Sequence, residues 1–240
     1  NYDAIDAGAK QVVKVEVPDS WKSEKAEALY TPEVKEGSEA VVAFVKNIQA
    51  KVNAQEGNTL PVSAFNDYVA GTTPSGTSAY EKRGIAVDVP VWIPENCIQC
   101  NQCAYVCHAV IRPVAMTEEE SQNAPASMKD IPMAAVPEKK FAMTVSVLDC
   151  TGCGSCVNIC PGKKGEKALK MESLDEHRDE QEAFDYGRKL PAKPEVLQKF
   201  KASTVKGSQF RQPLLEFSGA CAGCGETPYA KLITQLFGER

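Results

Sequence analysis

Two runs of four cysteines with the same spacing constrain this 240-residue chain more than any other feature. The first run is Cys97-x2-Cys100-x2-Cys103-x3-Cys107, and the second is Cys150-x2-Cys153-x2-Cys156-x3-Cys160. Cysteines at steps of three residues place three thiolates on one tight loop, with a fourth thiolate at the exit of the loop. The repeat therefore predicts two equivalent metal-binding loops.

This spacing is the one with which bacterial two-cluster ferredoxins hold cubane [4Fe–4S] clusters. In that arrangement the fourth cysteine of each run ligates the cluster of the other run. The crossing predicts one cluster on Cys97, Cys100, Cys103 and Cys160, and another on Cys150, Cys153, Cys156 and Cys107. We therefore expect two complete [4Fe–4S] clusters in this chain.

Disulfides and structural zinc are the alternative uses of the ten cysteines, and both fit less well. Disulfide scaffolds tend to be short secreted domains, whereas a chain of 240 residues can bury a hydrophobic core without disulfide cross-links. No signal peptide is expected in this sequence. Structural zinc wants pairs of CxxC units that close one tetrahedron. Because unpaired thiols and clusters need a reducing compartment, we expect a cytoplasmic location.

Composition argues against two classes of partner. The net charge of −5 and the pI near 5.3 argue against nucleic acid. No stretch approaches the roughly eighteen consecutive apolar residues that span a bilayer, so no membrane partner is expected.

Apolar periodicity predicts the elements around the cysteines. Alternation over 87–93 and 141–147 predicts a strand entering each cysteine run, and short apolar segments at 110–114 and 168–171 follow the runs. This internal repeat is a pseudo-twofold that accounts for the crossed fourth cysteines. Residues 117–140 are expected to be a surface insertion, and the charged segment 174–199 is expected to wrap the outside.

The cysteine-free region before residue 97 has its own signals. Alternating valines predict a strand over 11–17. Ser38 is a suitable N-cap for an amphipathic helix over about 38–55. The glycine-, threonine- and serine-rich stretch 71–78 is typical of a linker.

A third cysteine pair, Cys221 and Cys224, lies apart in the segment CAGCGETP. Thr227 as N-cap and Pro228 favour the start of a helix there. The expected buried face of that helix is Tyr229, Leu232, Ile233, Leu236 and Phe237. The pair thus lies on a glycine-rich loop whose backbone N–H groups can face a thiolate-bound cluster, with zinc or a disulfide as the alternative.

Several segments resemble the pyruvate:ferredoxin (flavodoxin) oxidoreductases. They are VPVWIPENCIQCNQCAYVC at 89–107, LDCTGCGSCVNICP at 148–161 and FSGACAGCGETPYAKLITQLFGER at 217–240. With LPVSAF at 60–65 and AYEKRG at 79–84, the resemblance covers about 60–240 well and 1–59 more loosely. One position departs from the family, because His108 follows Cys107 where the second run has Pro161. His108 as a replacement ligand is an alternative that the sequence leaves open.

The resemblance implies a large dimeric enzyme that oxidises pyruvate with coenzyme A to acetyl-CoA and carbon dioxide. Thiamine diphosphate with Mg²⁺ carries out the carbon chemistry, and three [4Fe–4S] clusters pass electrons to ferredoxin or flavodoxin. It implies that Cys221 and Cys224 supply two ligands of the third cluster and that Glu226 contacts thiamine diphosphate. No catalytic residue is expected in this portion of the enzyme.

The implied fold class is α+β, a two-[4Fe–4S] ferredoxin-like domain flanked by the end of one α/β domain and the start of a thiamine-binding α/β domain. The expected boundaries are 1–36 for the preceding α/β domain, 37–78 for a small connecting domain, 79–200 for the ferredoxin-like domain and 201–240 for the thiamine-binding domain.

Two other functions stay open. A stand-alone ferredoxin-like carrier would have both clusters but no need of the third cysteine pair. A relative that acts on another 2-oxoacid would share all the cluster chemistry. The acceptor is also open, because the lysines at 163, 164, 167 and 170 suit either an acidic docking partner or a solvated loop.

Overall fold

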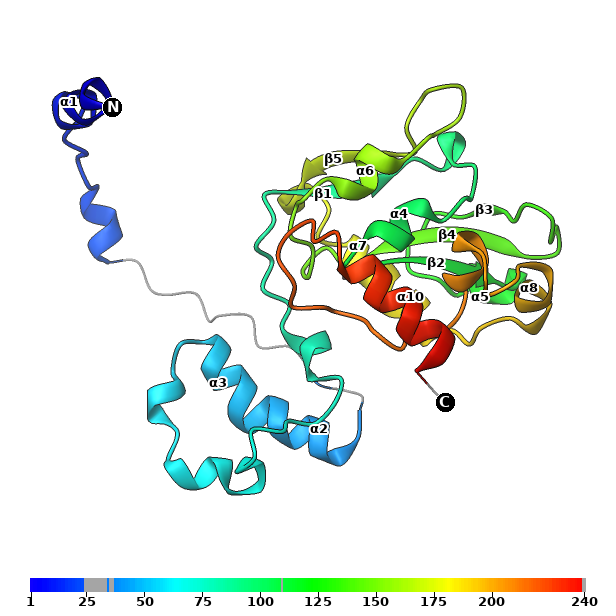
Figure 1. Ribbon diagram of the computed structural model, residues 1–240, viewed down its shortest axis with the longest axis horizontal. Helices are drawn as coiled ribbons and strands as arrows, with labels where there is room; N and C mark the ends of the chain where they lie inside the picture. Colours follow the sequence, from blue (N-terminus) through cyan, green and yellow to red (C-terminus); the bar gives the residue numbers. More distant parts are fainter. Residues whose placement is uncertain (24–33, 35–36, 109, 239–240) are drawn as a thin grey trace. The chain divides into compact units, whose positions relative to one another are not determined.

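The structure is a computed structural model that describes residues 1–23, 34, 37–108 and 110–238 (Figure 1). The chain divides into two compact units, Asn1–Thr31 and Pro32–Arg240. In the first unit, helix α1 (Tyr2–Lys10) leads into an extended stretch and a short 3-10 helix, Asp19–Lys22. The expected boundary at residue 36 lies outside the described residues.

The strand expected over 11–17 is wrong. Val13, Val15 and Val17 are exposed, and the described residues place no strand beside them. Alternating valines become a strand only where a neighbour accepts their backbone hydrogen bonds, and this segment has none among the described residues.

The helix expected over 38–55 is confirmed as one continuous helical segment. It consists of α2 (Glu39–Phe44), a π-helical turn (Val45–Gln49) and α3 (Ala50–Asn53). The Ser38 hydroxyl caps it by accepting a hydrogen bond from the N–H of Val41 at 3.4 Å. Val41, Val45 and Ile48 are its buried side chains, as the 3.6-residue period requires.

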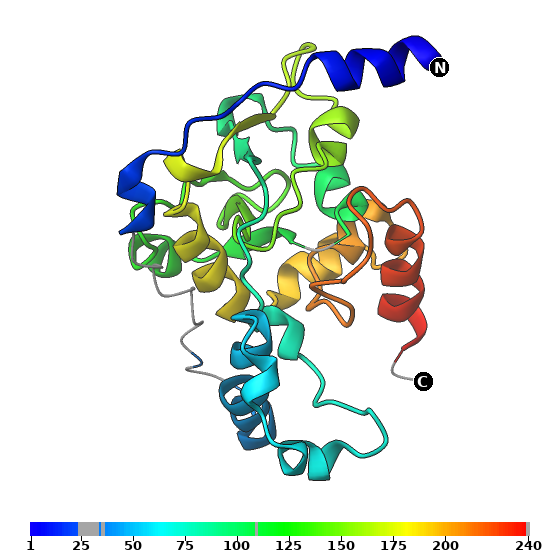
Figure 2. The same cartoon turned by 90° about the vertical axis from the view of Figure 1, so that its left-hand side faces the viewer.

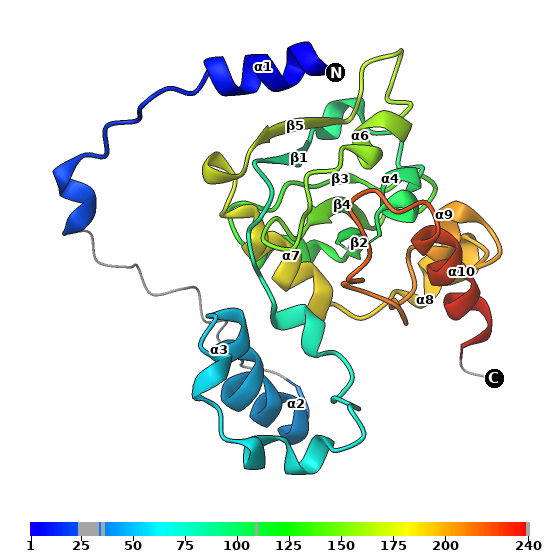
Figure 3. The same cartoon turned by 60° about the vertical axis from the view of Figure 1, so that its left-hand side comes forward.

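Two small antiparallel sheets form the ferredoxin-like part. The strands are β1 (Asp88–Trp92), β2 (Ile111–Met116), β3 (Ile131–Pro132), β4 (Lys140–Val145) and β5 (Leu169–Ser173). One sheet pairs β1 with β5, and the other has the order β2-β4-β3. Helices α4 (Gln102–Val106) and α6 (Ser155–Ile159) follow the cysteine loops and lie side by side (Figure 3).

This topology contains the internal repeat. One half is β1-α4-β2 and the other is β4-α6-β5, and the first strand of each half pairs with the last strand of the other half. The strands expected before both cysteine runs are confirmed as β1 and β4. Because the two halves exchange strands, the exit of each cysteine run lies beside the other half of the repeat.

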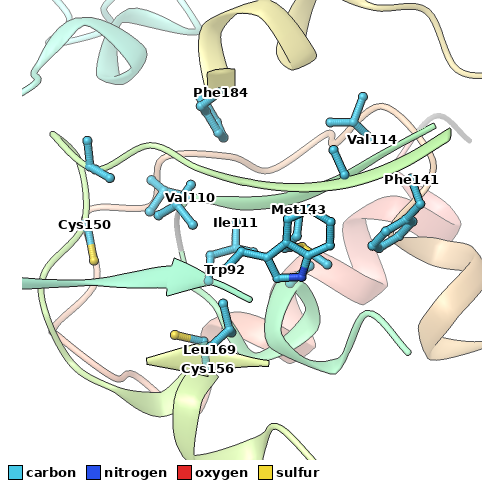
Figure 4. Packing of buried hydrophobic residues seen from close by; sticks show 14 of the residues in the cluster. Trp92, Val110, Ile111, Val114, Phe141, Met143, Cys150, Cys156, Leu169 and Phe184 are labelled. Atoms are coloured by element: carbon cyan, nitrogen blue, oxygen red, sulfur yellow. The ribbon is translucent and has the colours of Figure 1, made fainter. Parts of the chain in front are cut away.

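The core lies on both sides of the β2–β4 pair. In Figure 4, Phe184 lies above these strands, and Leu169 and Cys156 lie below them. Phe184 belongs to α7 (Glu180–Lys189), which packs on β2 and β4. The approach is close, because a Cβ on Gly187 would come within 2.7 Å of Val114.

Two expectations for the segments around this core hold only in part. Residues 174–199 do not only wrap the outside, since α7 buries Phe184 completely, although Glu182 and Lys189 on the same helix are exposed. Residues 117–140 are not only a surface insertion: after α5 (Glu118–Gln122) they add β3 to the sheet edge and bury Met133 and Val136. The mostly polar composition of residues 117–140 gave no sequence signal for the few apolar side chains that pack into the core.

Helices α8 (Pro194–Lys199), α9 (Val205–Ser208) and α10 (Thr227–Phe237) complete the fold (Figure 2). Helix α10 has Glu226, not Thr227, as its N-cap, and no side chain caps it. Its expected buried face is wrong in part, since Tyr229, Ile233 and Phe237 are exposed. Among the described residues, no helix combines the length and the apolar character that crossing a membrane requires.

Candidate metal centres and the third cysteine pair

The two cysteine loops have the same backbone. Gln99 and Asn101 in the first loop have φ of 56° and 62°, and Gly152 and Gly154 in the second have 69° and 72°. These left-handed residues turn the chain between successive cysteines of each run. The repeat is thus preserved even where its residues differ.

Side-chain hydrogen bonds hold the two non-glycine residues in this strained conformation. The Gln99 amide donates to the carbonyl of Pro132 at 2.8 Å and accepts from the N–H of Ala134 at 2.7 Å. The Asn101 amide donates to the carbonyl of Lys206 at 3.0 Å. Such bonds offset the cost of about 1–2 kcal/mol that a left-handed L-residue carries.

Backbone N–H groups donate to the cysteine sulfurs at equivalent places. The N–H of Gln99 reaches Cys97 Sγ at 3.4 Å, and that of Gly152 reaches Cys150 Sγ at 3.4 Å. At the loop exits, the N–H of Val110 reaches Cys107 Sγ at 3.1 Å. Likewise the N–H of Ala168 reaches Cys160 Sγ at 3.3 Å. Donors of this kind stabilise a metal-bound thiolate.

The charges of the thiols interact across the two runs. Burial raises the pKa of Cys97, and the charges of Cys100 and Cys160 raise it further. Burial raises the pKa of Cys150 to about 11, with contributions from Cys107 and Cys153. Each fourth cysteine therefore acts electrostatically on a thiol of the opposite run.

Two further charge interactions link thiols of the first run with thiols of the second run. Burial raises the pKa of Cys156, and the charge of Cys107 adds to this effect. Burial also raises the pKa of Cys103 well above its usual value, with the charge of Cys156 as the next contribution. The two groups of thiols are thus neighbours within one core.

The donor set fits iron–sulfur clusters. All ten cysteines are free thiols. Burial raises the pKa of four of them, Cys97, Cys103, Cys150 and Cys156, so these thiols resist ionisation unless a metal takes the charge. Within the described ranges, no three His, Cys, Asp or Glu side chains gather closely enough to hold one metal ion. A cube does not need this convergence, because each thiolate binds a different iron.

His108 occupies the place that Pro161 has in the second run. Its side chain is 3% exposed, and neither ring nitrogen has a hydrogen-bond partner. Burial lowers the pKa of His108, and the nearby Lys231 lowers it further. The imidazole is therefore held neutral behind Cys107.

The third cysteine pair lies against the second loop. The N–H of Cys224 donates to the carbonyl of Cys221 at 3.0 Å, which closes a tight turn. A Cβ on Gly223 would lie 3.5 Å from Cys153 Cβ and 3.4 Å from the Ser155 hydroxyl. The hydroxyl of Thr227, and then its N–H, lower the pKa of the Cys224 thiol at the start of α10. Glu226 is exposed beside this pair.

Two of the four lysines at 163–170 are engaged within the chain. Lys167 donates to the carbonyls of Val157 and Asn158 at the end of α6, and Lys170 pairs with Glu172 at 3.0 Å. Lys163 and Lys164 lie exposed in a short hairpin.

Sequence reasoning missed two lysines that contact the cysteine loops. Lys82 pairs with Asp149, the residue before Cys150, and Lys231 donates to the carbonyl of Cys107. Their partners lie 67 and 124 positions away in the sequence, and no periodic pattern marks such contacts.

Comparisons with known proteins agree with this arrangement. Residues 94–164 match the family described as a 4Fe-4S dicluster domain, and residues 31–86 match the EKR family, a domain of unknown function. Over 241 residues the chain is 50% identical to a pyruvate-flavodoxin oxidoreductase of Enterobacter agglomerans. Over 244 residues it is 48% identical to the pyruvate:ferredoxin oxidoreductase of Moorella thermoacetica. It is also 52% identical over 203 residues to a pyruvate dehydrogenase [NADP(+)] of Cryptosporidium parvum.

These relatives are much longer than the chain. Each of the two oxidoreductase matches covers 100% of the chain and 20% of the relative, whereas the Cryptosporidium match covers 82% and 10%. The chain is therefore homologous, over its whole length, to one-fifth of the pyruvate:flavodoxin and pyruvate:ferredoxin oxidoreductases, and this portion contains a 4Fe–4S dicluster domain.

Proposed function

We propose that this chain is the electron-transfer section of an enzyme that oxidises pyruvate with coenzyme A and passes the electrons to ferredoxin or flavodoxin. One observation carries the proposal: the two cysteine runs stand in halves that exchange strands, with α4 beside α6, and the charges of Cys160 and Cys107 act on thiols of the opposite run. The names of the relatives support the substrate and the acceptors. Free thiols in every cysteine fit a reducing, cytoplasmic compartment.

The proposed ligand sets follow the crossing. Cys97, Cys100, Cys103 and Cys160 would hold one [4Fe–4S] cluster, and Cys150, Cys153, Cys156 and Cys107 would hold the other. When bound, each cluster supplies a one-electron carrier. The chain's own residues would bind it through thiolates, and backbone N–H groups donate to Cys97, Cys107, Cys150 and Cys160.

We assign Cys221 and Cys224 as two ligands of a third [4Fe–4S] cluster, and Glu226 as a contact of thiamine diphosphate, which acts with Mg²⁺. The remaining ligands of that cluster would come from outside this chain. The contact of Gly223 with Cys153 pairs the third site with the set that Cys107 completes. The whole enzyme would be a homodimer.

The proposed domains keep the boundaries 1–36, 37–78, 79–200 and 201–240. The third cysteine pair stands on the last of these segments, at the start of α10, as expected for the beginning of a thiamine-binding domain. The ferredoxin-like segment contains both complete cysteine runs.

The test is acceptor reduction by the full-length protein, purified without oxygen. We expect pyruvate- and coenzyme A-dependent reduction of ferredoxin or flavodoxin, with EPR signals of reduced [4Fe–4S] clusters. A stand-alone carrier would be reduced by dithionite but not by pyruvate. Faster reduction with another 2-oxoacid would reassign the substrate, and a protein without iron would contradict the proposal.

A further inference from the structure

Lys231 ties helix α10 to the first cysteine run. Its ammonium donates to the carbonyl of Ala104 at 3.0 Å and to the carbonyl of Cys107 at 2.9 Å. These carbonyls are at the C-terminal end of α4, where the last turn has no partners within the helix. Figures 1 and 2 show α10 in red beside α4.

Lys167 makes the same kind of contact in the second half of the repeat. Its ammonium donates to the carbonyls of Val157, at 2.5 Å, and Asn158, at 3.0 Å. Val157 follows the third cysteine of its run, as Ala104 does in the first run. Each cysteine-loop helix therefore has one lysine ammonium at its C-terminal end.

The two lysines come from different places because the two loop exits differ in length. The N–H···S bonds make Val110 equivalent to Ala168, since each donates to the fourth cysteine of its run. The second run has residues 161–167 between these points, ending in Lys167, whereas the first has only 108–109. The first run thus has no lysine of its own at this position, and Lys231 supplies one from 124 positions beyond Cys107.

The charges around Lys231 are mixed. Its ammonium contacts the Cys107 end of the first run, whereas Lys206 interacts with the charges of Cys100 and Cys97. Glu216 faces Lys231 but lies near two guanidinium groups, those of Arg112 at 3.5 Å and Arg188 at 3.8 Å. Burial lowers the pKa of Lys231, and the charges of Cys107 and Glu216 act in the opposite direction and favour the ammonium. Because Lys231 is half-buried and Lys167 is exposed, solvent screens the charge of Lys231 less.

We propose that the charge of Lys231 raises the reduction potential of the cluster completed by Cys107, and that Lys167 does the same, more weakly, for the cluster completed by Cys160. A fixed cation beside a ligand favours the more negatively charged, reduced state. The inference rests on the proposed function, since it needs Cys107 to be a ligand. Helix α10 also follows the third cysteine pair. The docking of this helix therefore both positions that pair and places the charge that sets this potential.

The test is an EPR-monitored redox titration of the full-length holoprotein. The signal lost in Cys107→Ala identifies the relevant cluster. Lys231→Met should shift its reduction equilibrium roughly tenfold toward the oxidised form, about 59 mV for a one-electron couple, and leave the other cluster unchanged. Lys231→Arg should restore the wild-type value. Lys167→Met, the matched control, should produce a smaller shift in the cluster that Cys160→Ala removes.

Lys231→Gln separates charge from positioning, because the amide still donates hydrogen bonds to the α4 carbonyls but carries no charge. We expect it to keep the cluster and to lower the potential as Lys231→Met does. A wild-type potential in Lys231→Gln, with both clusters present, would overturn the inference and leave the proposed function standing. Absence of both clusters from the unmutated protein would overturn the two together.

Discussion

The ammonium of Lys82 pairs with the carboxylate of Asp149, and the two side chains are 9% and 8% exposed. Asp149 also accepts hydrogen bonds from the backbone N–H of Lys82 at 3.2 Å and from the Ser146 hydroxyl at 2.6 Å. It immediately precedes Cys150. The segment that contains Lys82, within the match to the EKR family, is thus anchored at the entrance to the second cysteine loop.

Lys82→Met should destabilise the protein by about 3–5 kcal/mol, because it leaves the buried Asp149 carboxylate without its cation. The measurement is the thermal unfolding midpoint of the holoprotein. The control is Arg83→Gln, which removes an exposed partner of Glu81 and should cost about 0–1 kcal/mol. Equal effects of the two variants would mean that the buried pair does not anchor this segment.

Gly223→Ala should loosen the third cysteine pair from the second loop. Gly223 has a φ of 70°, and its new Cβ would meet the Ser155 hydroxyl at 3.4 Å. The left-handed conformation alone costs an alanine roughly 1–2 kcal/mol. We expect slower pyruvate-dependent reduction of the acceptor in the full-length enzyme. Gly225→Ala, which meets no atom within 4 Å, is the matched control and should behave like the unmutated protein.

Cys221→Ser should remove the third cluster and spare the other two. The full-length protein should lose about four of about twelve iron atoms and all pyruvate-dependent acceptor reduction. The EPR signals of the two crossed clusters should persist after reduction with dithionite. Unchanged iron content together with unchanged turnover would exclude Cys221 as a ligand, and bound zinc in metal analysis would favour the alternative use of this pair.

The sequence predicts those elements whose signal is contained in a short stretch of the chain. The cysteine spacing and the alternation before each run predict β1, β4 and the repeat, and Ser38 predicts the start of the helical segment 39–53. These signals work because each is local.

Other features depend on partners that a local pattern does not contain. The valines before Pro18 alternate like a strand but have no neighbouring strand among the described residues. Phe184 lies in a segment of charged residues, so the sequence pattern does not mark it as a core residue, although its side chain is fully buried. The contacts of Lys82 and Lys231 join residues far apart in the chain, so only the folded structure reveals them.

Crossed ligation is the central claim, and paired cysteine variants test it without any prior assignment of EPR signals. We predict that Cys160→Ala and Cys97→Ala abolish the same [4Fe–4S] signal in the reduced holoprotein. Cys107→Ala and Cys150→Ala should both abolish the other signal. If Cys160→Ala instead removed the signal that Cys150→Ala removes, each run would hold its own cluster, and crossed ligation would be contradicted.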